Sequence, residues 1–188
     1  MDAPPKRYIN NKALCSIVRP QPYKMCSLLS IYEMICTISD GTSGTAPPPS
    51  FEYMVDHAMY SAEDMIDGKI GNEKMRELAA QYGLTLRVCK ALDEIPDWEG
   101  LKAHLYSGRP IIYHTIGHYL LIIGYIEEPM MISSGDRPKV SDGIGRWLVT
   151  ADHRVKFGTT HDRGMLEQVR WEAVIGTVVN NPNTALLI

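Results

Sequence analysis

Cysteines and histidines are the residues of this chain whose spacing suggests nucleophilic chemistry. Cys26 stands at the start of the apolar helical pattern CSLLSIYEMICTI, and the N-terminus of a helix favours a thiolate through its N–H groups and partial positive charge. Cys36 lies near the far end of that helix, where the dipole opposes a thiolate, while Cys15 and Cys89 occur in apolar, strand-like surroundings. A lone cysteine is most often a small buried hydrophobe. We nevertheless expect Cys26 to be the nucleophile and the other three to be core residues.

A thiol nucleophile needs a base, and six histidines could supply it: His57, His104, His114, His118, His153 and His161. His118 follows Gly117 at the start of an apolar strand, which would hold its ring on rigid backbone and leave space beside it. His114 is the nearest rival, and its spacing to His118 suggests a metal pair. We expect a turn between the two and find no third ligand. His118 is therefore the expected base, and no metal or cofactor is expected.

Two further residues would complete such a site. An imidazole base needs an acceptor on its other nitrogen, and Asp152 ends the apolar run RWLVT that follows the His118 strand. Asp142 is the weaker candidate. A developing oxyanion needs a donor, commonly a side-chain amide, and Gln21 stands just upstream of Cys26.

Apolar periodicity and turn residues indicate the elements that position these side chains. Expected helices cover 26–38, 51 to about 62, 72–82, 97–107 and about 164–172, and expected strands cover 84–88, 110–113, 119–126, 146–150 and 174–179. Asn72 is the expected cap of its helix, and Gly83 its stop. The glycine-, serine- and proline-containing stretch 131–145 is expected to be an irregular excursion. Helices that precede strands indicate an α+β fold.

Composition limits the classes of protein that fit. A chain of 188 residues with 45% hydrophobic and 22% charged residues suits one globular domain over 1–188. The net charge of −3 and the scattered basic residues argue against a nucleic-acid partner. We expect no membrane segment, because the longest apolar run is too short. The widely spaced cysteines and the N-terminus without a secretory pattern favour the cytoplasm, or delivery into another cell by another route.

The quoted features resemble the papain-like cysteine peptidase superfamily, and most closely the group of double-glycine leader peptidases. In that group a strand of the type "G-(R/K)-P-(I/V)-I" leads through a glycine to the catalytic histidine and into an apolar strand that ends in "GY". Here the segment SGRPIIYHTIGHYLLIIGYIEE carries Gly108-Arg109-Pro110, Gly117-His118 and Gly124-Tyr125 in those places. The match runs in order from Gln21 to Asp152.

The resemblance implies a papain-like fold, in which an N-terminal helical half packs its nucleophile helix on an antiparallel sheet. It implies Cys26 as nucleophile, His118 as general base and then acid, Asp152 as the orienting residue, and Gln21 as the oxyanion donor. Peptides or proteins would be the substrates.

Four features depart from the family pattern. Ser27 follows the cysteine where the family usually has glycine, and Gln21 stands one residue closer to Cys26 than is typical. His153 replaces the proline that commonly follows the aspartate. An insertion of about 127–145 lengthens the connection from His118 to Asp152, and we expect it to be a lid or a partner-binding element.

Three functions stay open. The first is a cysteine protease that hydrolyses peptide or amide bonds through an acyl-enzyme on Cys26. The same triad also serves glutamine deamidation and transamidation, as in effector proteins. The third is a catalytically inactive papain-like binding module, which the departures at Ser27 and His153 keep open, although the presence of all three triad residue types argues against it.

Overall fold

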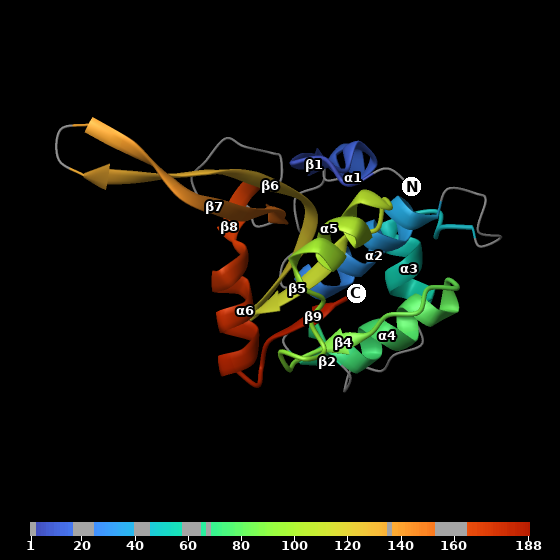
Figure 1. Cartoon of the computed structure of the whole chain (residues 1–188). Coiled ribbons are helices and arrows are strands. Elements are labelled where there is room, and N and C mark those ends of the chain that lie inside the picture. Colours follow the sequence, from blue (N-terminus) through green and yellow to red (C-terminus); the bar gives the residue numbers. More distant parts are fainter. Residues whose placement is uncertain are drawn as a thin grey trace, which may run out of the picture.

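The computed structural model describes residues 3–16, 25–39, 46–57, 65–66, 69–134, 137–152 and 165–188 (Figure 1). The helices within these ranges are α1 (Asn11–Ser16), α2 (Cys26–Ile38), α3 (Phe51–His57), α4 (Asn72–Gln81), α5 (Trp98–Tyr106) and α6 (Trp171–Asn180). The strands are β1 (Arg7–Ile9), β2 (Met65–Ile66), β3 (Lys69–Ile70), β4 (Val88–Cys89), β5 (Ile111–Thr115), β6 (His118–Ser134), β7 (Arg137–Asp152), β8 (Met165–Arg170) and β9 (Ala185–Leu187). Helices and one large antiparallel sheet confirm the expected α+β class.

The large sheet is ordered β4-β9-β5-β6-β7-β8, and β1 also pairs with β6. Strand β5 pairs with the first part of β6, from Thr115 opposite His118 to Ile111 opposite Ile122. Strand β1 then takes the same edge of β6, with Ile9 opposite Gly124. The opposite edge of β6 pairs with β7. Strand β6 is thus held on both sides from Leu121 to Ile126, which fixes the strand that begins at His118.

Alternate residues of the central strands face two separate apolar layers. On one face, Ile112 and Leu121 join the buried side chains of α2, and α2 packs against both β5 and β6. On the other face, Ile111 and Ile122 pack with side chains of α5 and α6. Ten of the thirteen residues of α2 are buried, which confirms the expectation of a helix that is apolar nearly all round. Figure 1 shows α6 beside the sheet, away from α3 and α4.

The expected excursion at 131–145 is wrong, because this segment continues β6 and β7 as one long hairpin. The two strands pair from Glu127 opposite Arg146 to Ser134 opposite Arg137, with one irregularity between Pro129 and Met131. In Figure 1 this two-stranded arm, residues 127–134 and 137–146, projects away from the helices. Glycine, serine and proline suggested a loop. The pairing of β6 with β7 nevertheless continues into this segment, because the register of the two strands is already set in the sheet.

The C-terminal expectations are also wrong. Residues 165–170 form strand β8 instead of a helix, and the run 174–179 lies in helix α6 instead of a strand. The β-branched residues of VIGTVV suggested a strand. Burial of Trp171, Val174 and Val178 follows the helical spacing of three and four, and packing against the sheet outweighs propensity. The terminal strand is β9.

Other boundaries were predicted with mixed success. The helix expected over 97–107 is α5, and Asp97 caps it by accepting a hydrogen bond of 2.8 Å from the Gly100 amide. The expected strand 84–88 is reduced to β4 at Val88–Cys89. Cys15 lies in helix α1, so its expected strand-like setting is wrong. Within the described ranges, no helix combines the length and the apolar character that crossing a bilayer requires.

Candidate active site

Cys26 is the first residue of α2, as the sequence predicts. The preceding residue, Met25, is the N-cap and makes no side-chain capping bond, and the first turn contains no acidic residue. The positive end of the helix dipole therefore acts on the Cys26 sulfur without a nearby carboxylate on the same turn to oppose it. The side chain is 1% exposed, so burial tends to keep the thiol protonated unless a base lies beside it.

His118 is placed by the turn that joins β5 to β6. Gly117 has a φ of 70°, a left-handed conformation that glycine adopts without strain, and Thr115 pairs with His118 across the turn. His118 is the first residue of β6, and its side chain is buried. The sheet therefore fixes the backbone of the base, as the sequence predicts.

Asp152 lies at the end of β7 that adjoins the start of β6. The register that places Leu121 opposite Ala151 brings His118 and Asp152 to the same end of the sheet, and β8 holds Asp152 from the other side through its pairing with Met165. Nε2 of His118 donates a hydrogen bond of 2.8 Å to Oδ1 of Asp152. Both side chains are buried, so little water competes for this bond.

His118 also hydrogen-bonds the side chain of Cys26, so the imidazole links the other two residues. Burial opposes protonation of the ring, but the hydrogen bonds and charges of Asp152 and Cys26 outweigh it and raise the pKa of His118. The surroundings thus favour a positively charged imidazole between two acidic groups. This is the electrostatic pattern of a thiolate–imidazolium pair.

Tyr119, the residue after His118, carries a buried hydroxyl that bonds residues before and at the start of α4. The Tyr119 hydroxyl donates to Oδ1 of Asn72 at 3.0 Å, and it lies 3.4 Å from the carbonyl oxygen of Ile70. Burial, and then the charge of Cys26, raise the pKa of Tyr119, so its hydroxyl is a neutral donor. The expected capping role of Asn72 is wrong, because Gly71 is the N-cap and Asn72 is the first helical residue.

Ser27, one of the departures from the family pattern, has a structural role. It is fully buried, and its hydroxyl oxygen accepts a hydrogen bond of 3.0 Å from the amide of Ile70 in β3. The residue that follows the candidate nucleophile therefore ties α2 to the segment that carries Asn72.

The remaining histidines are placed elsewhere or lie outside the described residues. His114 stacks on Tyr119, with ring centroids 4.0 Å apart and planes at 5°. His57 is exposed at the end of α3, and His104 lies in α5. Searching the described ranges finds no group of three or more His, Cys, Asp or Glu side chains able to hold a metal ion. Four other candidates lie outside the described side chains: Gln21, Asp142, His153 and His161.

Comparison of the chain with models of protein families, with curated proteins and with solved structures gives no match. The resemblance to papain-like peptidases therefore stays a prediction, carried by the residues named above.

Proposed function

We propose that this chain is a thiol-dependent amide hydrolase, a cysteine protease of papain-like fold that uses Cys26, His118 and Asp152. The observation that carries the proposal is the position of the His118 ring, which bonds Asp152 through Nε2 at 2.8 Å and also bonds the side chain of Cys26. A nucleophile, a base and an orienting carboxylate in one hydrogen-bonded chain are the parts that acyl transfer requires.

In the proposed reaction the Cys26 sulfur attacks the carbonyl carbon of a peptide or side-chain amide. His118 holds the thiol proton and delivers it to the leaving nitrogen as the C–N bond breaks, which leaves a thioester on Cys26 and a free amine. Water then attacks the thioester, gives one proton to His118, and releases the carboxylic acid. The second step returns the proton to the sulfur, so the cycle closes without a cofactor.

The tetrahedral intermediates need donors for their oxyanion. The backbone amides at the start of α2 suit this role, because the helix dipole adds positive potential there. Gln21 is the second proposed donor and lies outside the described residues.

The position of the hairpin arm favours partner binding over a lid. The arm begins at Glu127 and continues β6 at the end away from His118, and in Figure 1 it extends away from α2. Its base is anchored by Glu127, which accepts hydrogen bonds from Trp98 at 2.6 Å and from Lys102 at 3.1 Å. We propose that the arm positions a protein substrate or partner.

One observation favours the inactive binding module as the second candidate. Cys26 is 1% exposed and His118 is 6% exposed, and a buried sulfur reaches a peptide carbonyl only if the surrounding chain moves. A binding domain would need no such movement, because the same contacts would then only stabilise the fold.

The experiment that tests the proposal incubates the protein with a library of unstructured peptides and analyses both peptides and protein by mass spectrometry. New peptide termini, together with a transient acyl adduct on Cys26, are expected from a protease. Release of ammonia with a mass increase at glutamine side chains would identify a deamidase on the same triad. Cys26→Ala is the matched control. Peptides unchanged by the native protein, with no adduct on Cys26, would support the binding module.

A further inference from the structure

A second concave site lies at the far end of the nucleophile helix. A cavity of about 460 Å³ is bordered by Met34 and Ile38 of α2, by the segment 83–87, and by Pro110 at the start of β5. This volume falls within the range of small-molecule sites in proteins. Because α2 rises about 1.5 Å per residue over thirteen residues, the cavity is separated from Cys26 by most of the length of the helix. It is therefore distinct from the candidate active site.

Two arginines lie on the polar rim of this cavity. Arg87, His104 and Arg109 line it together with Thr85 and Ile188, and the backbone of Ile188 pairs with that of Arg87. Neither arginine forms an ion pair with a carboxylate in the part of the chain that the structure describes. Glu94 interacts with Arg87 electrostatically, but at a distance longer than that of an ion pair. The two guanidinium groups therefore present several N–H donors that no described carboxylate occupies as an ion pair.

The charges of Arg87 and Arg109 act on the nearby ring of His104. Burial of the ring lowers the pKa of His104, the charges of Arg109 and Arg87 lower it further, and the backbone of Pro110 acts in the opposite sense. Nε2 of His104 is buried and finds no hydrogen-bond partner among the described residues. The two arginine charges near His104 repel each other and disfavour protonation of its ring. A bound anion would offset that repulsion.

The apolar part of the cavity indicates what else the ligand must contain besides a negative charge. Met34, Ile38, Leu84 and Leu86 contribute side chains from α2 and from the segment that precedes β4. An inorganic ion would leave this apolar surface in contact with water, whereas an organic ion with a hydrocarbon or aromatic portion would cover it.

We propose that this cavity is a binding site for a small organic anion, in which Arg87 and Arg109 bind a phosphate or carboxylate group and the apolar wall binds the remainder. Arginine suits this role because its planar group donates two parallel hydrogen bonds to either anion. The proposal is independent of amide hydrolysis at Cys26.

The test is a titration of the full-length protein with phenyl phosphate, benzoate and phenol, followed through backbone amide shifts in NMR spectra. Phenyl phosphate or benzoate is expected to give saturable shifts in segment 83–87, and phenol is expected to bind on the order of ten-fold more weakly, because it lacks the charge. The stronger of the two anions identifies the preferred group. Equal binding of phenol and both anions, or no saturable shift with any of them, would overturn the proposal.

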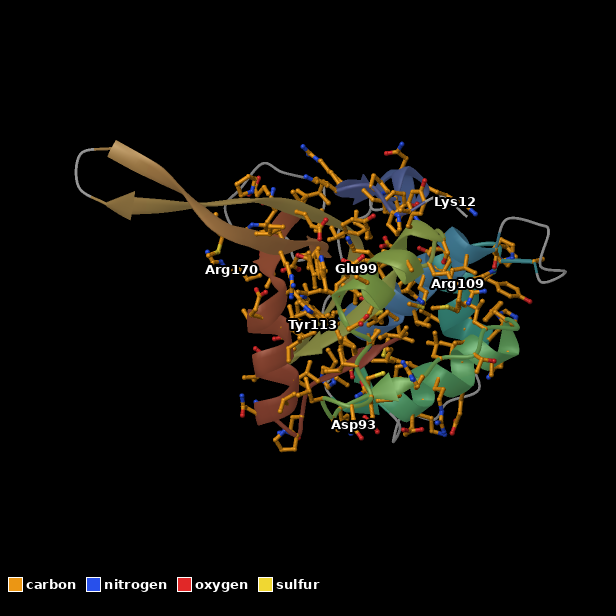
Figure 2. All side chains as sticks on the ribbon, in the orientation of Figure 1. Lys12, Asp93, Glu99, Arg109, Tyr113 and Arg170 are labelled. Atoms are coloured by element: carbon orange, nitrogen blue, oxygen red, sulfur yellow. The ribbon has the colours of Figure 1, made fainter. Side chains whose placement is uncertain are left out.

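Variants assign the binding to the two arginines. Arg87→Gln and Arg109→Gln are each expected to weaken binding of the preferred anion on the order of ten-fold, while Arg109→Lys retains part of it. Arg170→Gln is the matched control, because Arg170 contacts the Trp147 ring and lies well apart from Arg109 in Figure 2. Unchanged anion affinity in both arginine variants would show that these residues serve only the fold. Cys26→Ala is expected to bind the anion as the native protein does.

Discussion

The imidazole of His118 lies between two acidic side chains, with Nε2 2.8 Å from Oδ1 of Asp152 and a second hydrogen bond to the side chain of Cys26. The first bond joins residues 34 positions apart in the chain, and strand pairing brings them together. Neither Asp152 nor Cys26 alone would make His118 a catalytic base. Together they fix the orientation of the ring and favour its positive charge, which are the two properties that an acyl-transfer base needs.

Replacement of Asp152 should reveal its influence on His118. In Asp152→Ala the ring loses a hydrogen bond and a negative charge, so the pKa of His118 is expected to fall. Any amide hydrolysis should fall on the order of 100-fold. Asp152→Asn keeps an acceptor for Nε2 and should lose less activity, although the pKa of His118 should fall there too. NMR titration of the imidazole protons measures the shift, and an unchanged His118 pKa in both variants would contradict the assignment.

Two histidines should affect the pH dependence of stability with opposite signs. The pKa of His118 is raised in the folded state, so its stabilisation is fully present below a pH of about 6.5 and is lost as the pH rises through the folded pKa. The pKa of His104 is lowered, so its stabilisation is present above a pH of about 6.5 and is lost as the pH falls through the folded pKa.

Urea unfolding between about pH 5 and 8 measures these contributions. Compared with the native protein, His118→Gln should lose the part of the free energy of unfolding that decreases with rising pH. His104→Gln should lose the part that increases. Identical pH profiles for the native protein and both variants would show that the two surroundings do not perturb the rings.

Gly124 of β6 lies against the backbone of β1. A Cβ at this position would lie 2.9 Å from the Cα of Ile9 and closer still to the carbonyl oxygen of Tyr8, and backbone atoms cannot move aside as a flexible side chain can. Gly124→Ala should therefore lower the free energy of unfolding by about 2–3 kcal/mol. Gly176→Ala is the matched control, because no atom lies within 4 Å of its added Cβ, and it should stabilise α6 by up to about 1 kcal/mol. Chemical denaturation of the two variants checks both signs, and equal effects would contradict the close approach.

The hairpin arm should be removable without loss of the site. Glu127 and Arg146 are directly opposite each other, so an Asn-Gly turn in place of residues 128–145 would close a two-residue hairpin. The shortened protein should unfold cooperatively and keep the reactivity of Cys26, because the base of the arm stays anchored to Trp98 and Lys102. Loss of Cys26 reactivity in a folded variant would show that the arm belongs to the site. Binding or cleavage of protein substrates should weaken if the arm positions them.

Local signals made much of the candidate site predictable. The apolar pattern that begins at Cys26 predicts helix α2, and Gly117 with His118 marks a tight turn at the start of an apolar strand. Asp152 ends the run that pairs with that strand. In each case, the chemistry-bearing residue sits at the boundary of an element whose type follows from a few neighbouring residues.

Contacts between distant segments were not predictable in the same way. The bond from Tyr119 to Asn72 spans 47 residues, and an asparagine at the start of a helical pattern reads as a cap until tertiary contacts are known. The C-terminal run that contains Val174 and Val178 has strand propensity but packs as a helix. The cavity that Arg87 and Arg109 line combines residues of α2, α5 and the segment before β4, so it exists only once those elements are packed.

The most direct test of the central claim compares the alkylation rates of the individual cysteines by iodoacetamide near neutral pH, resolved by peptide mass spectrometry. Exposure alone predicts that Cys36, which is half-buried, reacts faster than Cys26, which is 1% exposed. An activated thiolate predicts the reverse order, and His118→Ala should then slow Cys26 about ten-fold or more without affecting Cys36. If Cys26 reacts no faster than Cys36 in the native protein, and His118→Ala leaves both rates unchanged, Cys26 is not a nucleophile activated by His118.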